Sequence, residues 1–332
     1  MKKFLPILAL GATVLFSGVV NAENTKAKIC VFDIIGENGP IMSRMKEYKI
    51  EALKWGAELE LKALTSEKLA MEEFKQGRCD GVMFSGFRAR SFVPFTGTLD
   101  AIGAMPTMEH LKAAISQLAT PKMAPFMVNG DFETAGVLPL GGALVFVKDK
   151  NISTLGKAAG KKVAVLDYDD TQRKMVNQVG ASPVPVDLMS IGGKFNNNSV
   201  DIVILPAFAY EPFELYKGLG ENGGVLKTPV TQLTGQFVIR RSKFPESFGQ
   251  KARAYSKKHF DKVEKIVTDA EAAIPSKYWI PLVQADVLQY NAMMKDARTR
   301  LEKEGYYDGK ALKFMKIVRC KMDNTLAECA GN

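Results

Sequence analysis

Short apolar runs separated by amphipathic segments recur along this chain and predict alternating strands and helices. Residues 29–35 form the first apolar run, and a helix is expected from Pro40 to about Trp55. Alternation at 59–64 predicts a half-exposed strand, and residues 80–85 predict a third strand after a helix that begins at Ser66. This order of strand, helix, strand, helix and strand is typical of a parallel sheet flanked by helices.

A second set of apolar runs lies between residues 155 and 206. Its order is strand, helix, strand, spacer and strand, and the runs are continuous, as in strands buried on both faces. Apolar segments at 139–148 and 236–240 bracket this set, so we expect the chain to leave a first lobe and return to it there, forming a hinge. From Ser247 onward the pattern is mostly helical.

The motifs in this second set resemble those of a known class of binding proteins. Gly160-Lys161-Lys162 precedes a strand, Gly180-Ala181-Ser182-Pro183-Val184 forms a turn into the next, and Val200-Asp201 opens a third. This order resembles the second domain of solute-binding proteins of the TRAP-transporter (DctP) type. Over the whole mature chain the sequence is similar to the AdeT-like group of solute-binding proteins, whose name is linked to efflux and drug resistance.

The resemblance implies an α/β fold with two lobes. Each lobe would hold a mainly parallel sheet flanked by helices, with a hinge between the lobes and a helical C-terminal region. Residues 23–142 with about 241–332 would form lobe I, and residues 143–240 lobe II. A small-molecule ligand, expected to be an anionic or polar solute, would bind between the lobes, draw them together, and pass to an inner-membrane permease. We expect a monomer.

The N-terminus predicts export to the periplasm. Lys2 and Lys3 are followed by a mostly apolar stretch at 4–20 and by Val20-Asn21-Ala22, which has small residues before an expected cut after Ala22. The alternative, a membrane anchor, is disfavoured because the apolar run is short and contains Pro6 and Gly11.

Four cysteines in an exported chain predict two disulfides. We favour Cys30–Cys79, at the heads of two apolar strands, and Cys320–Cys329, which closes a short loop; two other pairings stay open. The formal net charge is +9, or about +7 without Lys2 and Lys3. That excess can attract an anionic ligand or an anionic lipid surface, or can simply aid solubility.

Candidate ligand-binding residues follow the predicted strands, because ligands lie beyond the carboxyl ends of parallel strands. In the first lobe these are Glu37, Arg88 and Arg90. Arginine provides a planar fork for a carboxylate or phosphate and also stacks on aromatic rings. The alternative is a solvated loop in which both arginines extend into water.

In the second lobe the candidates are Tyr168, Arg173, Phe208, Tyr210 and Glu211. A helix beginning near Thr171 could present free amides to an anion, although Asp169 or Asp170 can simply cap that helix. Phe208 and Tyr210 could form an aromatic wall or pack in the core.

One position departs from the TRAP pattern. In that class an arginine usually lies in the strand after Gly-Lys-Lys and pairs with the ligand carboxylate, whereas Ala164 stands at the corresponding place here. Either Arg88, Arg90 or Arg173 replaces it, or the ligand is not a simple organic acid.

Other functions find little support in the sequence. It contains neither a Gly-x-Ser-x-Gly elbow nor a His-Glu-x-x-His motif, so a secreted hydrolase is a weak alternative. The cysteine spacing matches no zinc pattern, and His110 and His259 are the only histidines. We therefore expect no catalytic residues, no metal and no cofactor.

Scattered basic residues without interleaved aromatics argue against binding of nucleic acid. An envelope accessory protein without catalytic activity, associated with efflux or drug resistance, is the remaining alternative.

Overall fold

The computed structural model describes residues 24–324 and 326–329. The expected signal peptide, residues 1–22 with its cut after Ala22, lies outside the described residues. None of the helices in the described part of the chain combines the length and the apolar character that crossing a membrane requires.

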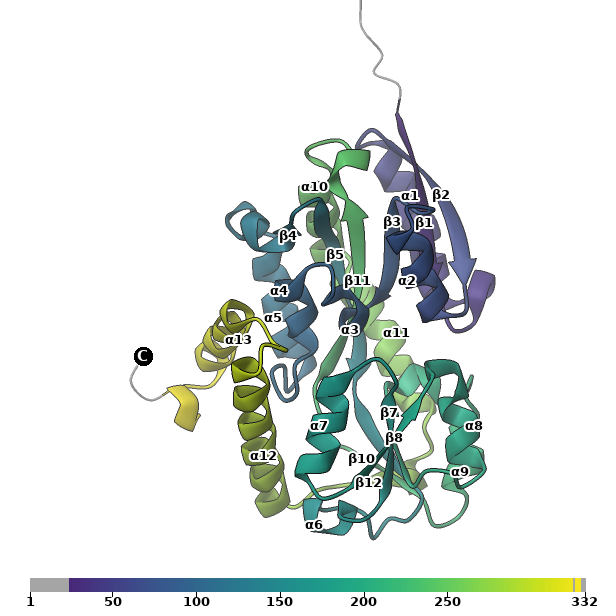
Figure 1. Cartoon of the computed structure of the whole chain (residues 1–332), viewed down its shortest axis with the longest axis vertical. Coiled ribbons are helices and arrows are strands. Elements are labelled where there is room, and N and C mark those ends of the chain that lie inside the picture. The colour runs from purple at the N-terminus through teal and green to yellow at the C-terminus, as the bar shows by residue number, and fades with distance from the viewer. Residues whose placement is uncertain (1–23, 325, 330–332) are drawn as a thin grey trace, which may run out of the picture.

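The first sheet has six strands in the order β2-β1-β3-β11-β5-β4 (Figure 1). Strands β1, β2 and β3 run parallel, and β11, β5 and β4 add to them in antiparallel pairs. Their bounds are β1 Thr25–Phe32, β2 Ala57–Leu64, β3 Gly81–Ser85, β4 Val128–Asn129, β5 Phe132–Gly142 and β11 Gln232–Arg240. Helices α1 (Pro40–Leu53) and α2 (Glu67–Lys75) connect the parallel strands.

The second sheet also has six strands, in the order β12-β10-β6-β9-β7-β8. Strand β7 pairs in parallel with β8 and β9, whereas β6 is antiparallel to β9 and β10. The bounds are β6 Leu144–Val147, β7 Lys162–Leu166, β8 Ser182–Val186, β9 Ile202–Leu205, β10 Gly224–Leu226 and β12 Trp279–Ile280. Two helix-flanked sheets confirm the expected fold class, and both sheets are mixed rather than parallel throughout.

Two of the crossings between the sheets lie side by side, and the chain crosses again before β12, which joins the second sheet although its residues were expected in the first lobe. The chain leaves the first sheet at the end of β5 and enters the second as β6, with Ala143 between them. On the return, Thr231 precedes β11, and Ala143 donates its N–H to the Thr231 carbonyl at 2.8 Å. Strand β11, which the sequence placed in the second lobe, pairs along its length with β3 and β5 in the first sheet, where both of its faces are buried.

The start of α1 shows how the sequence determines local structure. Asp33, at the end of β1, accepts hydrogen bonds from the N–H groups of Ile41 and Met42 at 2.8 and 3.0 Å, and so caps the helix. Pro40 occupies the first helical position, where its missing N–H costs nothing. A β-carbon on Gly39 would lie within about 2 Å of the Asp33 carboxylate, so the capping contact requires glycine there.

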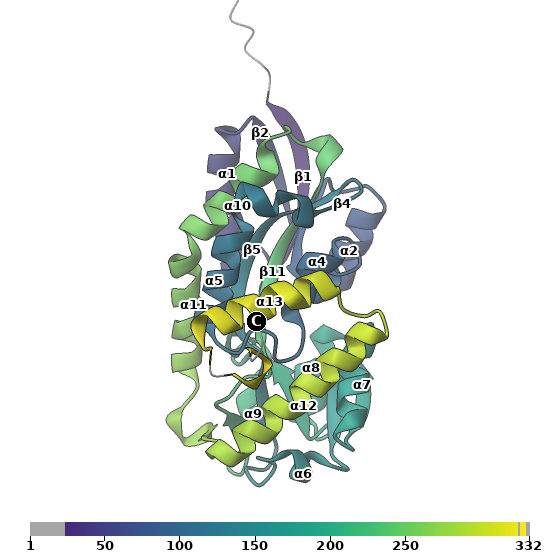
Figure 2. The ribbon, with the colours of Figure 1, turned by 90° about the vertical axis from the view of Figure 1, so that its left-hand side faces the viewer.

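The C-terminal region is helical, as expected. Its helices are α10 (Phe248–Lys258), α11 (Phe260–Ala273), α12 (Gln284–Lys303) and α13 (Gly309–Met322). Figure 2 shows α13 crossing the middle of the molecule and α12 running obliquely beside the second sheet. Leu301 of α12 and Met315 of α13 are buried with Leu99 and with Leu111 of α5 (Met108–Leu118), so these helices complete a core beside the first sheet.

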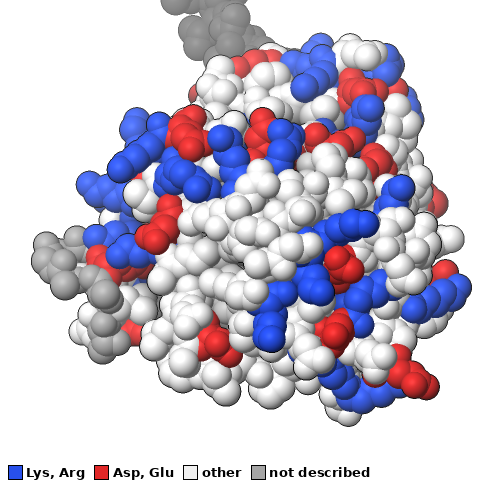
Figure 3. All heavy atoms as spheres, turned by 60° about the horizontal axis from the view of Figure 1, so that its bottom comes forward, with Lys and Arg blue, Asp and Glu red and all other residues white. Residues whose placement is uncertain are grey.

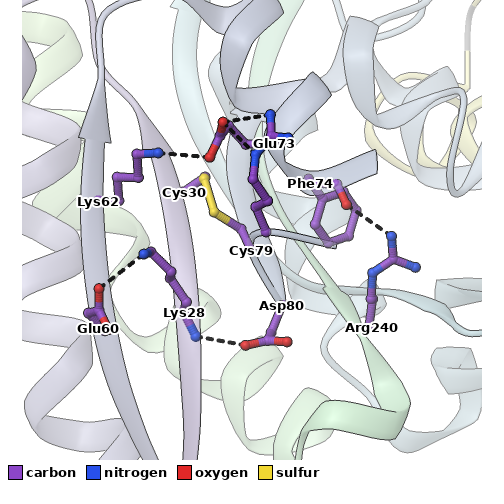
Figure 4. The surroundings of a disulfide bond; sticks show 10 residues. Lys28, Cys30, Glu60, Lys62, Glu73, Phe74, Cys79, Asp80 and Arg240 are labelled. Carbon is purple, nitrogen blue, oxygen red and sulfur yellow. Dashed lines mark hydrogen bonds and ion pairs between the residues drawn. A yellow bond between two sulfur atoms is a disulfide. The ribbon is translucent and has the colours of Figure 1, made fainter. Parts of the chain in front are cut away.

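Both expected disulfides, Cys30–Cys79 and Cys320–Cys329, are present and confirm the favoured pairings. Cys30 lies on β1 and Cys79 just before β3, and both are buried. Figure 4 shows Glu73 of α2 beside this disulfide, with Lys62 donating to its carboxylate at 2.7 Å. The bond therefore ties two neighbouring strands together underneath a helix.

The two disulfides should contribute unequally to stability because they close loops of different length. Their sequence separations are 49 and 9 residues. The chain-entropy relation gives about 4 kcal/mol for Cys30–Cys79 and about 2.7 kcal/mol for Cys320–Cys329. In urea unfolding, we expect the double variant Cys30→Ala/Cys79→Ala to lose more free energy of unfolding, relative to wild type, than Cys320→Ala/Cys329→Ala. Equal losses, or a larger loss for Cys320→Ala/Cys329→Ala, would contradict the expectation.

Candidate ligand-binding site

A cavity of about 130 Å³ lies between the two sheets. Strands of the first sheet contribute Phe32, Ser85, Leu140 and Leu233, and strands of the second contribute residues 164–166 together with Ile204 and Leu205. Further lining residues include Ile34, Glu67, Phe87, Asp100, Ile102, Ala143, Tyr168, Thr171, Gln172, Met175, Val176, Leu188, Ile191, Pro206, Phe208, Phe213, Val230, Thr231 and Tyr307. Most of these side chains are apolar, as in many small-molecule sites.

A buried cluster of Glu67, Arg88 and Tyr168 joins the two sides of this cavity. Glu67 begins α2 and is 3% exposed, and Arg88 in the short helix α3 (Gly86–Ala89) is 7% exposed. Tyr168 follows β7, and its hydroxyl donates a hydrogen bond to Glu67 Oε2 at 3.0 Å. Arg88 Nε lies 3.7 Å from the same oxygen. The Arg88 guanidinium stacks over the Tyr168 ring at 3.2 Å from its centroid.

The chemistry of this cluster keeps Tyr168 protonated. Burial, followed by the neighbouring Glu67 carboxylate, raises the pKa of Tyr168 well above its usual value. The other oxygen of Glu67 accepts the backbone N–H of Ser85 at 2.7 Å. The carboxylate is therefore shared by α2, the end of β3 and the loop after β7.

A second ion pair links Arg90 to Asp169. Arg90 Nη1 lies 3.6 Å from Asp169 Oδ1, and Arg90 Nε donates to the Gly97 carbonyl at 3.3 Å. Asp169 also caps α7 (Asp170–Gln178), because its carboxylate accepts the N–H of Thr171 at 3.0 Å. Asp169 therefore acts as the helix cap, which was the alternative to an anion-binding helix terminus. The N-terminus of α7 is already occupied by this carboxylate of the protein.

Asp100 provides a third carboxyl group at the cavity wall. It is 3% exposed and accepts a hydrogen bond from the Thr234 hydroxyl at 2.5 Å. Burial raises its pKa to about 7, against the opposing effects of the Thr234 hydrogen bonds and of the Arg90 charge. Asp100 therefore changes its protonation state near neutral pH.

The predicted site residues are distributed unequally around this cavity. Tyr168 and Phe208 line it. Arg88 and Arg90 lie close by, each paired with a carboxylate of the protein. Arg173 is exposed on α7 and pairs with Asp170 at 2.5 Å, away from the lining.

Three other predicted residues lie outside the cavity lining. Tyr210 is 3% exposed and packs in the core of the second sheet. Glu37 and Glu211 are exposed, and Glu37 pairs with Lys46 at 2.7 Å. Of the two aromatic residues, Tyr210 therefore packs in the core, whereas the Phe208 ring borders the cavity.

Sequence reasoning missed Glu67, Ser85 and Asp100. Glu67 looked like an ordinary acidic residue in the first turn of a helix. Ser85 ends the predicted third strand, so the rule that selected Arg88 could have found it. Asp100 gave no local signal, because its partner Thr234 is 134 residues away.

One group in the described residues could resemble a metal site: Cys30, Glu73 and Cys79. The two cysteines form a disulfide, so their sulfurs are not thiolates. The surface charges do not form a single basic patch on the face in Figure 3, where lysines and arginines alternate with acids around a broad uncharged area.

The fold is that of the TRAP periplasmic solute-binding proteins. A TRAP periplasmic solute-binding protein from Desulfovibrio salexigens, solved with bound orotic acid, superposes with a TM-score of 0.72 at 15% identity, covering 91% of this chain and 100% of that one. Another from Sulfitobacter, solved with bound β-D-galacturonate, gives 0.68 at 15% identity, with 89% and 99% coverage. At this identity the likeness concerns the fold.

The particular family follows from sequence comparison. The model of the family "Solute-binding protein AdeT 1/2" matches residues 42–332. The chain is also 45% identical, over 302 residues, to the probable solute-binding protein AdeT1 of Acinetobacter baumannii, covering 91% of this chain and 99% of that protein. The chain belongs to the AdeT1/2 family of solute-binding proteins, which confirms the resemblance noted in the sequence.

The raised pKa of Asp100 makes a testable prediction for stability. The folded chain holds this proton more tightly than the unfolded chain, where the pKa is near 3.8. Its stabilising effect is present at low pH and is lost as the pH rises from about 4 to about 7. The wild-type free energy of unfolding, relative to Asp100→Asn, should fall by about 1.4 kcal/mol per pH unit over this range and level off above about pH 8.

Urea unfolding of both proteins at a series of pH values measures this difference. Asparagine keeps the size of the side chain and removes its titration. Parallel stability curves for the two proteins would show that Asp100 does not titrate in this range.

Proposed function

We propose that this protein captures a small solute in the cavity between the two sheets and delivers it to a membrane permease. The observation that carries the proposal is the cavity itself, whose wall is built from strand ends of both sheets. Membership of a solute-binding family supports binding rather than catalysis. The TRAP relatives solved with orotic acid and β-D-galacturonate show that this fold accommodates small solutes.

In this proposal the protein acts in the periplasm after removal of residues 1–22. The lobes are those expected from the sequence, residues 23–142 with about 241–332 and residues 143–240, with β11 moved to the first lobe and β12 moved to the second. The adjacent crossings at Ala143 and Thr231 serve as the hinge, because only short segments join the two sheets there. Closure around the solute then creates the surface that the permease recognises.

The binding residues we propose are those of the lining and their direct supports. Tyr168 and Phe208 contact the solute from the second sheet. Arg88 acts through the Tyr168 ring, over which it stacks. Arg90 holds Asp169 and so fixes the start of α7 beside the cavity.

Solute binding should be measurable as added thermal stability. A ligand that binds only the folded chain adds about 2.7 kcal/mol to stability when its free concentration is 100 times Kd. We expect at least one fraction of a cell extract, separated by size below about 1 kDa, to raise the melting temperature of the ligand-free protein. The measurement is a thermal-shift screen on protein that has been unfolded, dialysed and refolded.

The control is a matched pair of alanine substitutions. Ala164 lines the cavity, whereas Ala159 is exposed beyond α6 (Leu155–Ala158). Ala164→Trp should abolish the shift and Ala159→Trp should retain it. A shift that persists in Ala164→Trp would place the binding elsewhere, and the lack of any active fraction would contradict the proposed function.

A further inference from the structure

We propose that the solute is an uncharged, largely apolar molecule with a hydrogen-bonding group, rather than an organic acid. This inference rests on the proposed function, since it concerns the occupant of the same cavity. It is carried by the charges around the cavity, by one hydroxyl without a partner, and by the apolar lining.

In the described part of the chain, the cavity wall offers no positive charge to a carboxylate. Among the described residues that line it, none is lysine, arginine or histidine, and the ionisable side chains are Glu67, Asp100 and two tyrosines. Ala164, at the position where TRAP proteins usually carry an arginine, is 5% exposed and contributes only a methyl group. An anion in this space would face two carboxyl groups, a mostly apolar wall and uncharged polar side chains such as those of Gln172 and Thr231.

Each of the two nearby arginines has a carboxylate of the protein beside it. Arg88 Nε lies 3.7 Å from Glu67, and Arg90 Nη1 lies 3.6 Å from Asp169. Neither Arg88 Nε nor Arg90 Nη2 has a hydrogen-bond partner among the described residues, and neither arginine belongs to the cavity lining. A ligand carboxylate that approached Arg88 would also approach Glu67, which is 3% exposed, and like charges at this distance repel each other. The two arginine charges are therefore matched by two carboxyl groups of the protein.

One polar atom at the wall is free for a ligand. The Ser85 hydroxyl lies at the end of β3, is buried, and finds no hydrogen-bond partner among the described residues. Buried hydroxyls normally have a partner, so this atom suits a solute that donates or accepts one hydrogen bond. Apolar rings such as those of Phe87 and Phe208 form the surrounding wall. The volume of about 130 Å³ is similar to that of a dry apolar cavity that holds benzene.

Benzyl alcohol and benzoate test the charge of the preferred ligand, because they share one ring and differ mainly in a hydroxyl against a carboxylate. We expect calorimetry at pH 7.5 on the mature protein to show benzyl alcohol binding at least 10-fold more tightly than benzoate. Indole, an uncharged ring with an N–H donor, should bind like benzyl alcohol. Orotate and galacturonate serve as organic-acid probes.

The same alanine pair locates the binding. Ala164→Trp should reduce the affinity for benzyl alcohol at least 10-fold, and Ala159→Trp should leave it within about twofold. Circular dichroism checks that each variant is folded, and Ala164→Leu, a smaller filling substitution, replaces Ala164→Trp if the latter does not fold.

The outcomes separate this inference from the proposed function. Benzoate, orotate or galacturonate binding in the cavity as tightly as benzyl alcohol, or more tightly, overturns the ligand class and leaves solute capture intact. If neither benzyl alcohol nor indole binds, the proposed ligand class is also overturned. If in addition no extract fraction stabilises the protein, the proposed function fails as well.

Discussion

The buried carboxylate of Glu67 is the interaction on which the arrangement between the sheets depends. It receives the N–H of Ser85 from the end of β3, the hydroxyl of Tyr168 from the loop after β7, and the charge of Arg88. Glu67 is 3% exposed, and burying such a polar group is costly unless partners like these hydrogen-bond to it. Because the partners come from both sides of the cavity, this carboxylate links the two sheets and lies beside the Arg88 guanidinium.

The buried carboxylates change the interpretation of Arg88 and Arg90, which the sequence analysis selected as ligand-binding candidates. Two arginines after a strand, near the carboxyl end of a sheet, indicate an anion site by residue type alone. The structure places Arg88 3.7 Å from Glu67 and Arg90 3.6 Å from Asp169, so each arginine has an opposite charge of the protein beside it. The apolar lining and Ala164 then become consistent with each other, since neither provides for a charged solute.

Much of the fold could be predicted from local patterns, and the failures share a physical cause. The strands β7 and β9 and the capping of α2 by Ser66 follow from short-range apolar runs and capping residues. Both disulfides followed from the positions of four cysteines. Residues 236–240 were predicted as a hinge segment at the end of the second lobe, whereas they lie in β11 inside the first sheet, because the pairing depends on partners far away in sequence. Asp100 and Thr234 escaped notice for the same reason.

The most direct test of the account is the chemical identity of the molecule that the native protein carries. Protein purified from the periplasm under gentle conditions can be denatured, extracted, and analysed by mass spectrometry beside an Ala164→Trp preparation. The account predicts a small uncharged molecule that partitions into organic solvent, released by the wild type and depleted in the variant. A carboxylate released by the wild type and depleted in the variant would contradict the ligand class, and equal release from both proteins would contradict the site.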